Sequence, residues 1–528
     1  MRHMRLTAGL LAMTFICFIP WCGMCAQSLN IIHSFAGAPS DGQRPMGQGL
    51  ITDGSKLYGM TQEGGSGDTA QGWGTIFSLK PDGSDYSVLH SFHPAGTQYD
   101  DDGRLPFGGL TLDSINNRLY GMACYGGFAD KGMIFFVNIG DSGYGYLYDF
   151  GDTPANPGLG PEGSLLLSGG KLYGMTRYGG ANHVGVVFSK TTGEVSTGCT
   201  SLHSFAGKPG DGMSPFGSLI LDGGKFYGMT HEGGTGPGVW GSGVIFSMNV
   251  DGSGHTILHN FTGEPSDGVG ADGTLVMDSG TQTLYGVTNT GGSSSKGTIF
   301  SIGTNGANYQ ILHSFIGEPG DGENPGDVLL KGGTLYGLTG TGGSTEGGTL
   351  YSIQTDGSGY TILHNFNDSQ RDGPVGFAGP LLSIGNNLYG MTYSGGTFYN
   401  GTVFSFGLSA PQAEMLLSGS SLKAGDHFEA TFQLNESIER PFTAFAIIIL
   451  PGGSMLNALT LTPKLAPVAA NVPRLNAPFN FRLISTTISG GAPIGAYEVV
   501  AAFFDPQTRI TGRQDAFLEA SGRFTIGQ

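Results

Sequence analysis

The chain is poor in charged residues, and poorest in basic ones. Asp, Glu, Lys and Arg make up 12% of its 528 residues, about half of the usual share, and 24 basic residues stand against 41 acidic ones. The net charge of −17 repels nucleic acid and anionic lipid headgroups, so we expect no nucleic-acid partner. Cysteine is scarce as well, with five in the chain. A chain of this length can bury a large core without disulfides.

Long apolar stretches are also missing, apart from one at the N-terminus. Two arginines precede the apolar run 6–19, and short residues then lead to Ala26. This order is typical of a secretory signal peptide, which we expect to be residues 1–26. A lipid-modified cysteine and an uncleaved anchor remain alternatives, although a run of about 14 residues is short for a span. The mature chain is therefore predicted to lack a membrane span and to be secreted, periplasmic or at the cell surface.

Glycine is in large excess, with 96 residues. Glycine enrichment without a period would indicate disorder, but here a Tyr-Gly pair recurs seven times at intervals of 51 to 62 residues. A period of this length is typical of solenoids and propellers. The seven tyrosines of these pairs are Tyr58, Tyr120, Tyr173, Tyr227, Tyr285, Tyr336 and Tyr389.

Each repeat holds four short runs of β-branched and aromatic residues bounded by Gly, Asp or Pro, which indicates four antiparallel strands. Four such strands make one propeller blade, and seven copies make seven blades. Residues 29–35 form a fourth-type run with no earlier runs, and 401–405 form a third-type run with no fourth. The N-terminal strand should therefore complete the last blade and close the ring. The sequence predicts a seven-bladed β-propeller over residues 27–407.

The composition changes after Pro411, where glycine becomes less frequent. Strand-like runs follow at 428–432, 442–450, 458–462, 479–484, 497–504 and 522–526. Short strands at this spacing predict an immunoglobulin-like β-sandwich over residues 412–528, which we interpret as a spacer or interaction module. The predicted fold class is all-β, a seven-bladed β-propeller followed by an immunoglobulin-like β-sandwich.

The pattern Leu-Tyr-Gly-Met-Thr, Gly-Gly, Gly-Thr-Ile-Phe-Ser, Asp-Gly-Ser, Leu-His-Ser-Phe carries a family resemblance. It resembles the GloVer-type tandem repeat of secreted bacterial proteins described as choice-of-anchor, and it covers most of residues 29–407. The order of the runs is also similar to kelch propellers, which implies that the first run is innermost. The resemblance implies no known activity or substrate.

Residues that recur once per blade are expected to be structural, because they lie around a ring and cannot converge. We expect the repeated histidines to bond to neighbouring backbone, and each Asp-Gly to cap a turn, with repeated calcium sites as the alternative. No metal or cofactor site is predicted. The histidines are His33, His90, His203, His259, His313 and His364, and the aspartates are Asp41, Asp102, Asp211, Asp267, Asp321 and Asp372.

A single site on a sevenfold scaffold should lie where the repeat is broken. The second-to-third and fourth-to-first loops are expected to share one face, the natural binding surface. Blades 1 and 4 have twelve-residue second-to-third loops in place of eight, each with a Glu and a Trp. The candidate ligand-binding residues are Glu63, Trp73, Tyr99, Arg104, Tyr125, Tyr178, His183, His231, Glu232, Trp240, Tyr393 and Tyr399. Aromatics beside carboxylates suit sugar or peptide, although each Trp could instead pack its own loop.

Three functions remain open. The favoured one is a non-enzymatic binding or scaffold propeller with a carbohydrate or surface-protein partner, because no nucleophile motif, zinc spacing or nucleotide loop occurs. The first alternative is a carbohydrate-active hydrolase or lyase using Glu63 and Glu232, which requires loops folded over the axis because blades 1 and 4 lie nearly opposite. The second is a structural envelope protein. Cys124 and Cys199 should not pair, because they belong near opposite faces of different blades.

Overall fold

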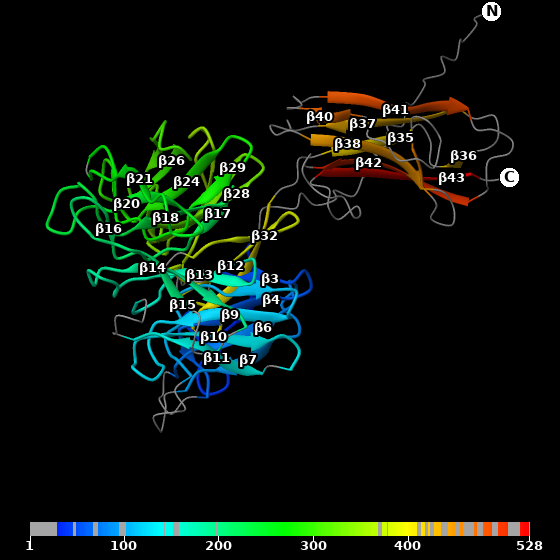
Figure 1. Cartoon of the computed structure of the whole chain (residues 1–528). Helices are drawn as coiled ribbons and strands as arrows, with labels where there is room; N and C mark the ends of the chain where they lie inside the picture. Colours follow the sequence, from blue (N-terminus) through cyan, green and yellow to red (C-terminus); the bar gives the residue numbers. More distant parts are fainter. Residues whose placement is uncertain are drawn as a thin grey trace, which may run out of the picture.

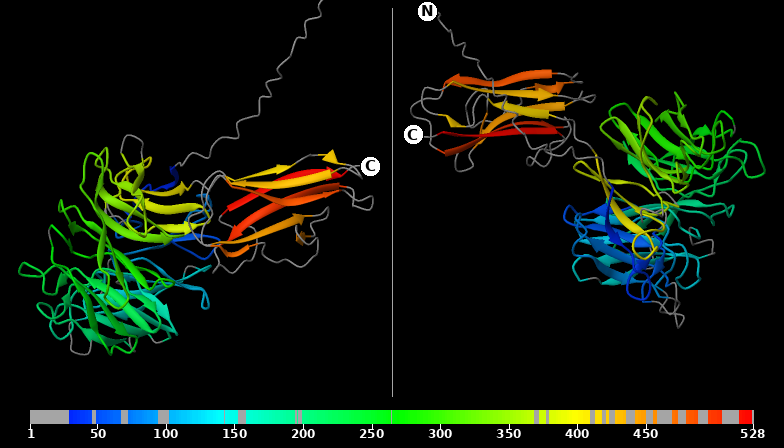
Figure 2. Two further views of the ribbon diagram at one scale, coloured as in Figure 1. Left: turned by 90° about the horizontal axis from the view of Figure 1, so that it is seen from above. Right: turned by 180° about the vertical axis from the view of Figure 1, so that it is seen from behind.

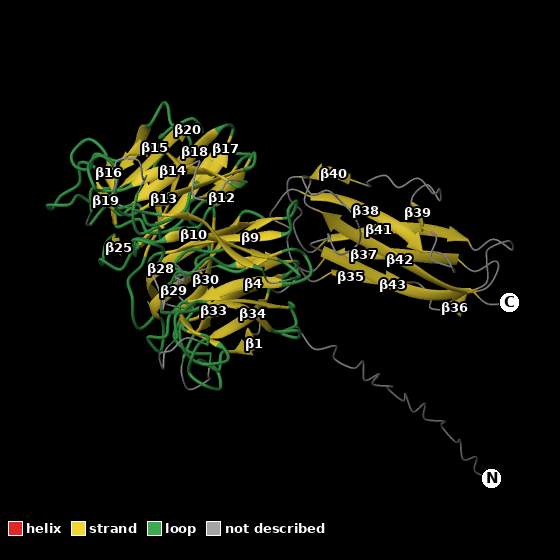
Figure 3. Cartoon of the chain, turned by 60° about the horizontal axis from the view of Figure 1, so that its bottom comes forward, coloured by secondary structure: helices red, strands yellow, loops and turns green. Residues whose placement is uncertain are grey.

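The structure, a computed structural model, describes residues 29–408 except 46–48, 67–71, 94–101, 142, 152–157, 194, 196–198, 264, 368–371 and 377–378. Beyond residue 412 it describes strands alone. The predicted signal peptide and the run expected at 458–462 lie outside the described residues. The regular elements are all strands (Figure 3), and no described segment forms a helix long and apolar enough to cross a membrane.

Seven four-stranded antiparallel sheets form the blades of a propeller, with the strands of blades 1 to 6 in chain order across each sheet (Figure 1). Blade 1 is β3 (Ile51–Thr52), β4 (Leu57–Thr61), β6 (Thr75–Leu79) and β7 (Ser87–Ser91). Blade 2 is β8 (Thr111–Asp113), β9 (Arg118–Ala123), β10 (Met133–Asn138) and β11 (Tyr144–Asp149). Blade 3 is β12 (Leu166–Ser168), β13 (Lys171–Thr176), β14 (Val186–Thr191) and β15 (Cys199–Ser204). Blade 4 is β17 (Ile220–Asp222), β18 (Lys225–Thr230), β20 (Val244–Asn249) and β21 (Thr256–Asn260).

Blade 5 is β23 (Val276–Asp278), β24 (Thr283–Thr288), β26 (Thr298–Gly303) and β27 (Gln310–Ser314). Blade 6 is β28 (Gly322–Lys331), β29 (Thr334–Gly342), β30 (Thr349–Gln354) and β31 (Thr361–Asn365). Blade 7 is β32 (Leu382–Ile384), β33 (Asn387–Thr392), β34 (Thr402–Gly407) and the N-terminal strand β1 (Leu29–Ser34).

The ring closes through the first and last strands of the propeller. Strand β1 pairs antiparallel with β34, so that Leu29 lies opposite Phe406 and Ser34 opposite Thr402. In Figure 2 the blue start of the propeller lies beside its yellow end. A cluster of buried side chains, including Leu57 and Val403, continues the core across this junction. The predicted closure is confirmed, and it pairs two strand edges that would otherwise be open.

The recurrent Tyr-Gly pair is explained by packing inside each blade. The ring of the phenylalanine in the third run packs against the glycine of the second run. A Cβ on Gly228, for example, would lie 2.7 Å from the ring of Phe246. These phenylalanines are fully buried and pack into clusters shared by adjacent blades, such as the cluster that joins Met229 and Phe300. Each buried Phe contributes about 1.5–3 kcal/mol. In blade 6 the ring belongs to Tyr351, whose hydroxyl is buried.

Hydrogen bonds between neighbouring first runs hold the inner ends of blades 2 to 6 together. The backbone N–H groups of Gly109, Ser164 and Ser218 each donate to the hydroxyl of the corresponding residue in the next blade, at 2.7, 2.8 and 3.3 Å. The series ends where the N–H of Thr274 donates to the carboxylate of Asp327 at 2.7 Å. Small polar residues at this position therefore tie successive blades around the axis.

The C-terminal strands form two sheets. The smaller contains β35 (Ala413–Leu417), β37 (His427–Leu434) and β41 (Phe479–Thr487). The larger contains β36 (Ser421–Leu422), β43 (Leu518–Ile526), β42 (Gly495–Phe504), β38 (Phe442–Ile449) and β39 (Met455–Asn457), with β40 (Ala469–Val472) also paired to β38. Strands coincide with five of the six expected runs. The immunoglobulin-like arrangement stays a prediction.

Candidate functional site

The two classes of loop expected on one face pair with each other. Just after the repeated Asp, strand β16 (Gly212–Met213) pairs with β19 (Glu232–Gly233), which follows the second run. Blades 1 and 5 repeat this ribbon with β2 (Gly42–Gln43) and β5 (Glu63–Gly64), and with β22 (Gly268–Val269) and β25 (Thr290–Gly291). Gly233 has a φ of 92°, and a Cβ there would lie 2.5 Å from the carbonyl oxygen of Asp211, so this crossing requires glycine.

The repeated histidines do not bond to backbone as predicted, but to the repeated aspartates. His259 Nε2 lies 3.0 Å from Asp267 Oδ2, and the same pair recurs in the other copies. The loop after the fourth run turns back so that its Asp reaches the histidine of that run. The other oxygen, Asp267 Oδ1, accepts the N–H of Gly268 at 2.7 Å, which confirms the predicted turn cap.

A tyrosine from the following blade completes most of these pairs. Tyr309 donates its hydroxyl to Asp267 at 2.5 Å, and its ring stacks on His259 at 3.7 Å. Burial raises the pKa of Asp267, but the donors from His259, Tyr309 and backbone outweigh it, and the net pKa is lowered. Each His–Asp pair, with the tyrosine where one is present, therefore links two neighbouring blades, and we call this group an inter-blade pin. Because N–H and O–H donors surround the carboxylate, it does not favour the calcium alternative.

A cavity of about 890 Å³ is lined by the inner ends of all seven blades. Small residues form most of its wall, which leaves the middle of the ring open. The wall also carries larger polar residues, of which Arg177 and Asn289 follow directly after a second run. The others are Glu162, Asp272, Asn324, Asp327 and Thr341, with Phe107 and Phe216 as aromatic neighbours.

An arc of contacts runs along the cavity from blade 3 to blade 5. Arg177 Nη1 lies 3.3 Å from Glu162 Oε1, and its guanidinium carbon lies 4.4 Å from the ring centroid of Phe216. Phe216 contacts His231 at 5.7 Å between ring centroids, and His231 Nδ1 bonds to Asp272 Oδ1. Asn289 donates to the other oxygen of Asp272 at 2.6 Å. We call these six residues the axial arc.

The electrostatics of this region differ from those of the pins. Burial raises the pKa of Glu162, and Arg177 offsets only part of that effect. Burial also raises the pKa of Asp327 to about 6. The hydrogen bond to Asp272 raises the pKa of His231, which favours imidazolium beside the carboxylate. Perturbed carboxyl groups that share one cavity are typical of functional sites.

Two atoms of the axial arc lack a hydrogen-bond partner among the described residues. They are Glu162 Oε2, an acceptor, and Arg177 Nε, a donor, and both are buried. The Glu162 side chain is only 8% exposed. An unsatisfied buried polar group costs about 1–3 kcal/mol, so a ligand or water that pairs both atoms would be favoured.

Of the predicted site residues, His231 alone belongs to the axial arc. Trp73, Arg104 and Tyr125 do come together, with the Arg104 guanidinium 5.6 Å from each ring, and Trp73 also packs on a hydrophobic cluster. Trp73 thus follows the alternative in which the ring packs against the protein, whereas Trp240 is 61% exposed.

The remaining predicted residues are scattered. Glu63 pairs with Arg44, whose guanidinium lies over the ring of Tyr393, and Glu232 accepts a hydrogen bond from Ser214. The two glutamates thus engage different partners. Tyr178, His183 and Tyr399 are exposed on loops, although the Tyr178 ring centroid lies 5.0 Å from the guanidinium carbon of Arg177 in the axial arc. Tyr99 lies outside the described residues. Cys124 and Cys199 are free thiols, as predicted.

Sequence reasoning missed Glu162, Arg177, Asp272, Asn289 and Asp327. The sequence feature that could have indicated Arg177 and Asn289 is the position directly after the repeated threonine. It holds a different residue in each of the seven blades, with Arg177, His231 and Asn289 among them.

Comparisons with known proteins agree with the repeat architecture. No curated protein matches the chain. Among solved structures it is similar to the tricorn protease (9% identity, TM-score 0.22), with 87% of this chain matched to 55% of that one. It is also similar to a putative oxidoreductase (glucose dehydrogenase) from Thermus thermophilus (13%, 0.34; 72% and 99%). A third is a GH43 β-xylosidase/α-arabinofuranosidase from a compost microbial metagenome (11%, 0.28; 54% and 97%).

Identities and scores as low as these give no basis for transferring an activity. The family described as the Gloeobacter/Verrucomicrobia repeat, by contrast, matches residues 23–238 and 236–436. These matches cover most of the chain, including every blade, so the chain belongs to the Gloeobacter/Verrucomicrobia repeat family, as the repeat pattern predicted.

Proposed function

We propose that this protein is a secreted or cell-surface propeller that binds a saccharide in its axial cavity without transforming it. The observation that carries the proposal is the unpartnered pair formed by Glu162 Oε2 and Arg177 Nε. A sugar hydroxyl both donates and accepts, so it can satisfy this acceptor and this donor. The ring of Phe216 lies beside them and offers a surface for the apolar face of a sugar.

The size and charge of the cavity favour a small ligand over a protein as the binding partner. Its volume of about 890 Å³ lies within the usual range for ligand pockets, about 300–1,000 Å³. The ion pairs Glu162–Arg177 and Asp272–His231 each join an acid to a base, so the arc has little net charge if His231 is protonated. A neutral, hydroxyl-rich ligand suits such a site better than an anion.

The test is a glycan-binding screen on the mature protein, followed by calorimetry with the best glycan. Glu162→Gln and Arg177→Met should each weaken binding about 10-fold or more, in line with loss of a hydrogen bond to a charged group. Arg104→Met is the matched control, because Arg104 also forms an ion pair and contacts two rings but does not line the cavity. Loss of binding in the control alone would place the site on the loops instead.

A second candidate, a glycoside hydrolase, is favoured by the contrast between two carboxyl groups of the arc. Burial raises the pKa of Glu162, as a general acid requires, while both oxygens of Asp272 are bonded, one to His231 and one to Asn289. The predicted pair Glu63 and Glu232 has no comparable setting. Incubation of the bound glycan with the protein distinguishes the two functions. Release of reducing ends by the parent, lost in Asp272→Asn with binding retained, would establish hydrolysis.

A further inference from the structure

Blade 4 departs from the repeat at one inter-blade pin. In blade 2 Tyr148 stands in place of the repeated histidine. Four positions before this histidine, or before Tyr148, four blades have a tyrosine. Three of these tyrosines donate to the Asp carboxylate of the preceding blade. In blade 4 that position holds His255, which faces His203 and Asp211 of the neighbouring pin. The four tyrosines are Tyr86, Tyr144, Tyr309 and Tyr360.

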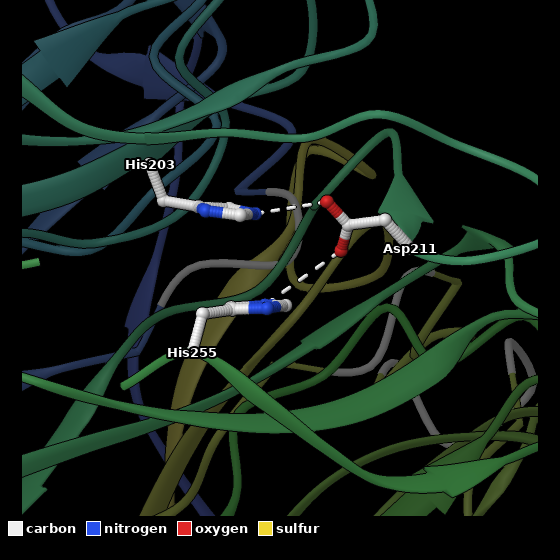
Figure 4. A group of neighbouring side chains, drawn as sticks. All are labelled: His203, Asp211 and His255. Atoms are coloured by element: carbon white, nitrogen blue, oxygen red, sulfur yellow. Dashed lines mark hydrogen bonds and ion pairs between the residues drawn. The ribbon is translucent and has the colours of Figure 1, made fainter. Parts of the chain in front are cut away.

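The substitution places a second imidazole where a phenol would be. His203 Nε2 lies 2.9 Å from Asp211 Oδ2, and His255 Nε2 lies 3.7 Å from Asp211 Oδ1, so both rings face one carboxylate (Figure 4). One donor atom from each of the three residues lies within 4.8 Å of the others. The distance of 3.7 Å is too long for a hydrogen bond.

His255 Nε2 is consequently a buried nitrogen without a hydrogen-bond partner in the described part of the chain. The tyrosine hydroxyl that it replaces does bond to the carboxylate, for example Tyr309 to Asp267. Histidine in place of tyrosine therefore lacks this hydrogen bond and places a second imidazole nitrogen opposite the aspartate. The three side chains are 10% to 20% exposed, but His255 Nε2 itself is buried, so an ion from solvent reaches all three donors only when the rings move.

We propose that His203, Asp211 and His255 form a binding site for a divalent transition-metal ion of the zinc type. Two imidazole nitrogens and one carboxylate are donors that zinc accepts, and three protein ligands leave a fourth position for water. Binding replaces the His203–Asp211 hydrogen bond, and both Nε2 atoms must be unprotonated. The rings now stack at 3.9 Å and 10°, so they must tilt apart for their lone pairs to converge. Metal–nitrogen bonds outweigh the small loss of stacking.

The test is calorimetric titration of the chelator-treated mature protein with zinc, where the parent should bind one equivalent. His255→Tyr restores the residue of the other blades, so it should fold normally and bind about 100-fold more weakly or worse, since even losing a residue that supports a ligand costs about 10–100-fold. Cys199→Ser is the control, because this thiol begins the strand that carries His203, and it should leave zinc affinity unchanged.

A variant with the opposite change gives a second test of the metal site. Tyr309→His places a second imidazole beside His259 and Asp267, so this variant should bind two equivalents of zinc. Absence of zinc binding by the parent, or undiminished affinity in His255→Tyr, would overturn the proposal. Loss of binding in Cys199→Ser would assign the ion to a thiolate site instead. A saccharide-binding result has no bearing on this outcome, because none of the three residues lines the axial cavity.

Discussion

The carboxyl group of Asp327 gives a quantitative test of the inner wall of the propeller. At this position five other blades have Gly, Ser or Thr, and burial raises the pKa of Asp327 from 3.8 to about 6. A folded-state pKa above the unfolded value means that the folded state binds the proton more tightly. Asp327 therefore destabilises the protein above pH 6, and this cost disappears as the pH falls towards 3.8.

The size of the pKa shift of Asp327 determines its effect on the free energy of unfolding. Each pKa unit corresponds to about 1.4 kcal/mol, which gives an upper limit of about 3 kcal/mol at pH 7.5. Asp327 borders the cavity, where water screens its charge, so we expect about 1–2 kcal/mol. Asp327→Asn keeps an acceptor for the N–H of Thr274 and removes the charge. The variant should thus be more stable than the parent at pH 7.5, and about half of that advantage should be lost at pH 5.

Urea denaturation of both proteins at the two pH values measures the effect. Ser164→Ala is a suitable reference, because it removes the acceptor of the Gly109 N–H from the same hydrogen-bond series without changing charge. Its effect on stability should not depend on pH. Equal stability of Asp327→Asn and the parent at pH 7.5, or an advantage that does not shrink at pH 5, would refute the reasoning.

Three further predictions concern the ring. Tyr309→Phe should lower the free energy of unfolding by about 1–3 kcal/mol, because it removes the hydroxyl donor of Asp267, and denaturant midpoints measure this. Trp73→Ala should lower the melting temperature, since Trp73 packs on a hydrophobic cluster, whereas Trp240→Ala should leave it unchanged because the ring is 61% exposed. Deletion of residues 27–36 should sharply lower the melting temperature and promote association on gel filtration, because it exposes β34 along its length; a stable monomer would contradict ring closure.

The fold was predictable because each blade repeats the same chemistry. Four runs with the right turns appear in nearly every copy, so errors in one copy are corrected by the others. The unpaired runs at the two ends predicted ring closure, and the pairing of Leu29 with Phe406 confirms it. Side-chain partners were less accessible. Nothing in the spacing of His259 and Asp267 says that the loop between them turns back, so backbone was expected as the partner of the histidine.

The axial arc escaped prediction because loop length was taken as the mark of a site. Insertions lengthen the loops, and Trp240, in the longer loop of blade 4, lies exposed rather than on the cavity wall. A residue can converge with its equivalents only where the blades approach one another, at the inner ends of the strands. Arg177 and Asn289 occupy that place without any change in loop length. In a sevenfold ring, variation at an inner position therefore carries more information about function than insertion at an outer one.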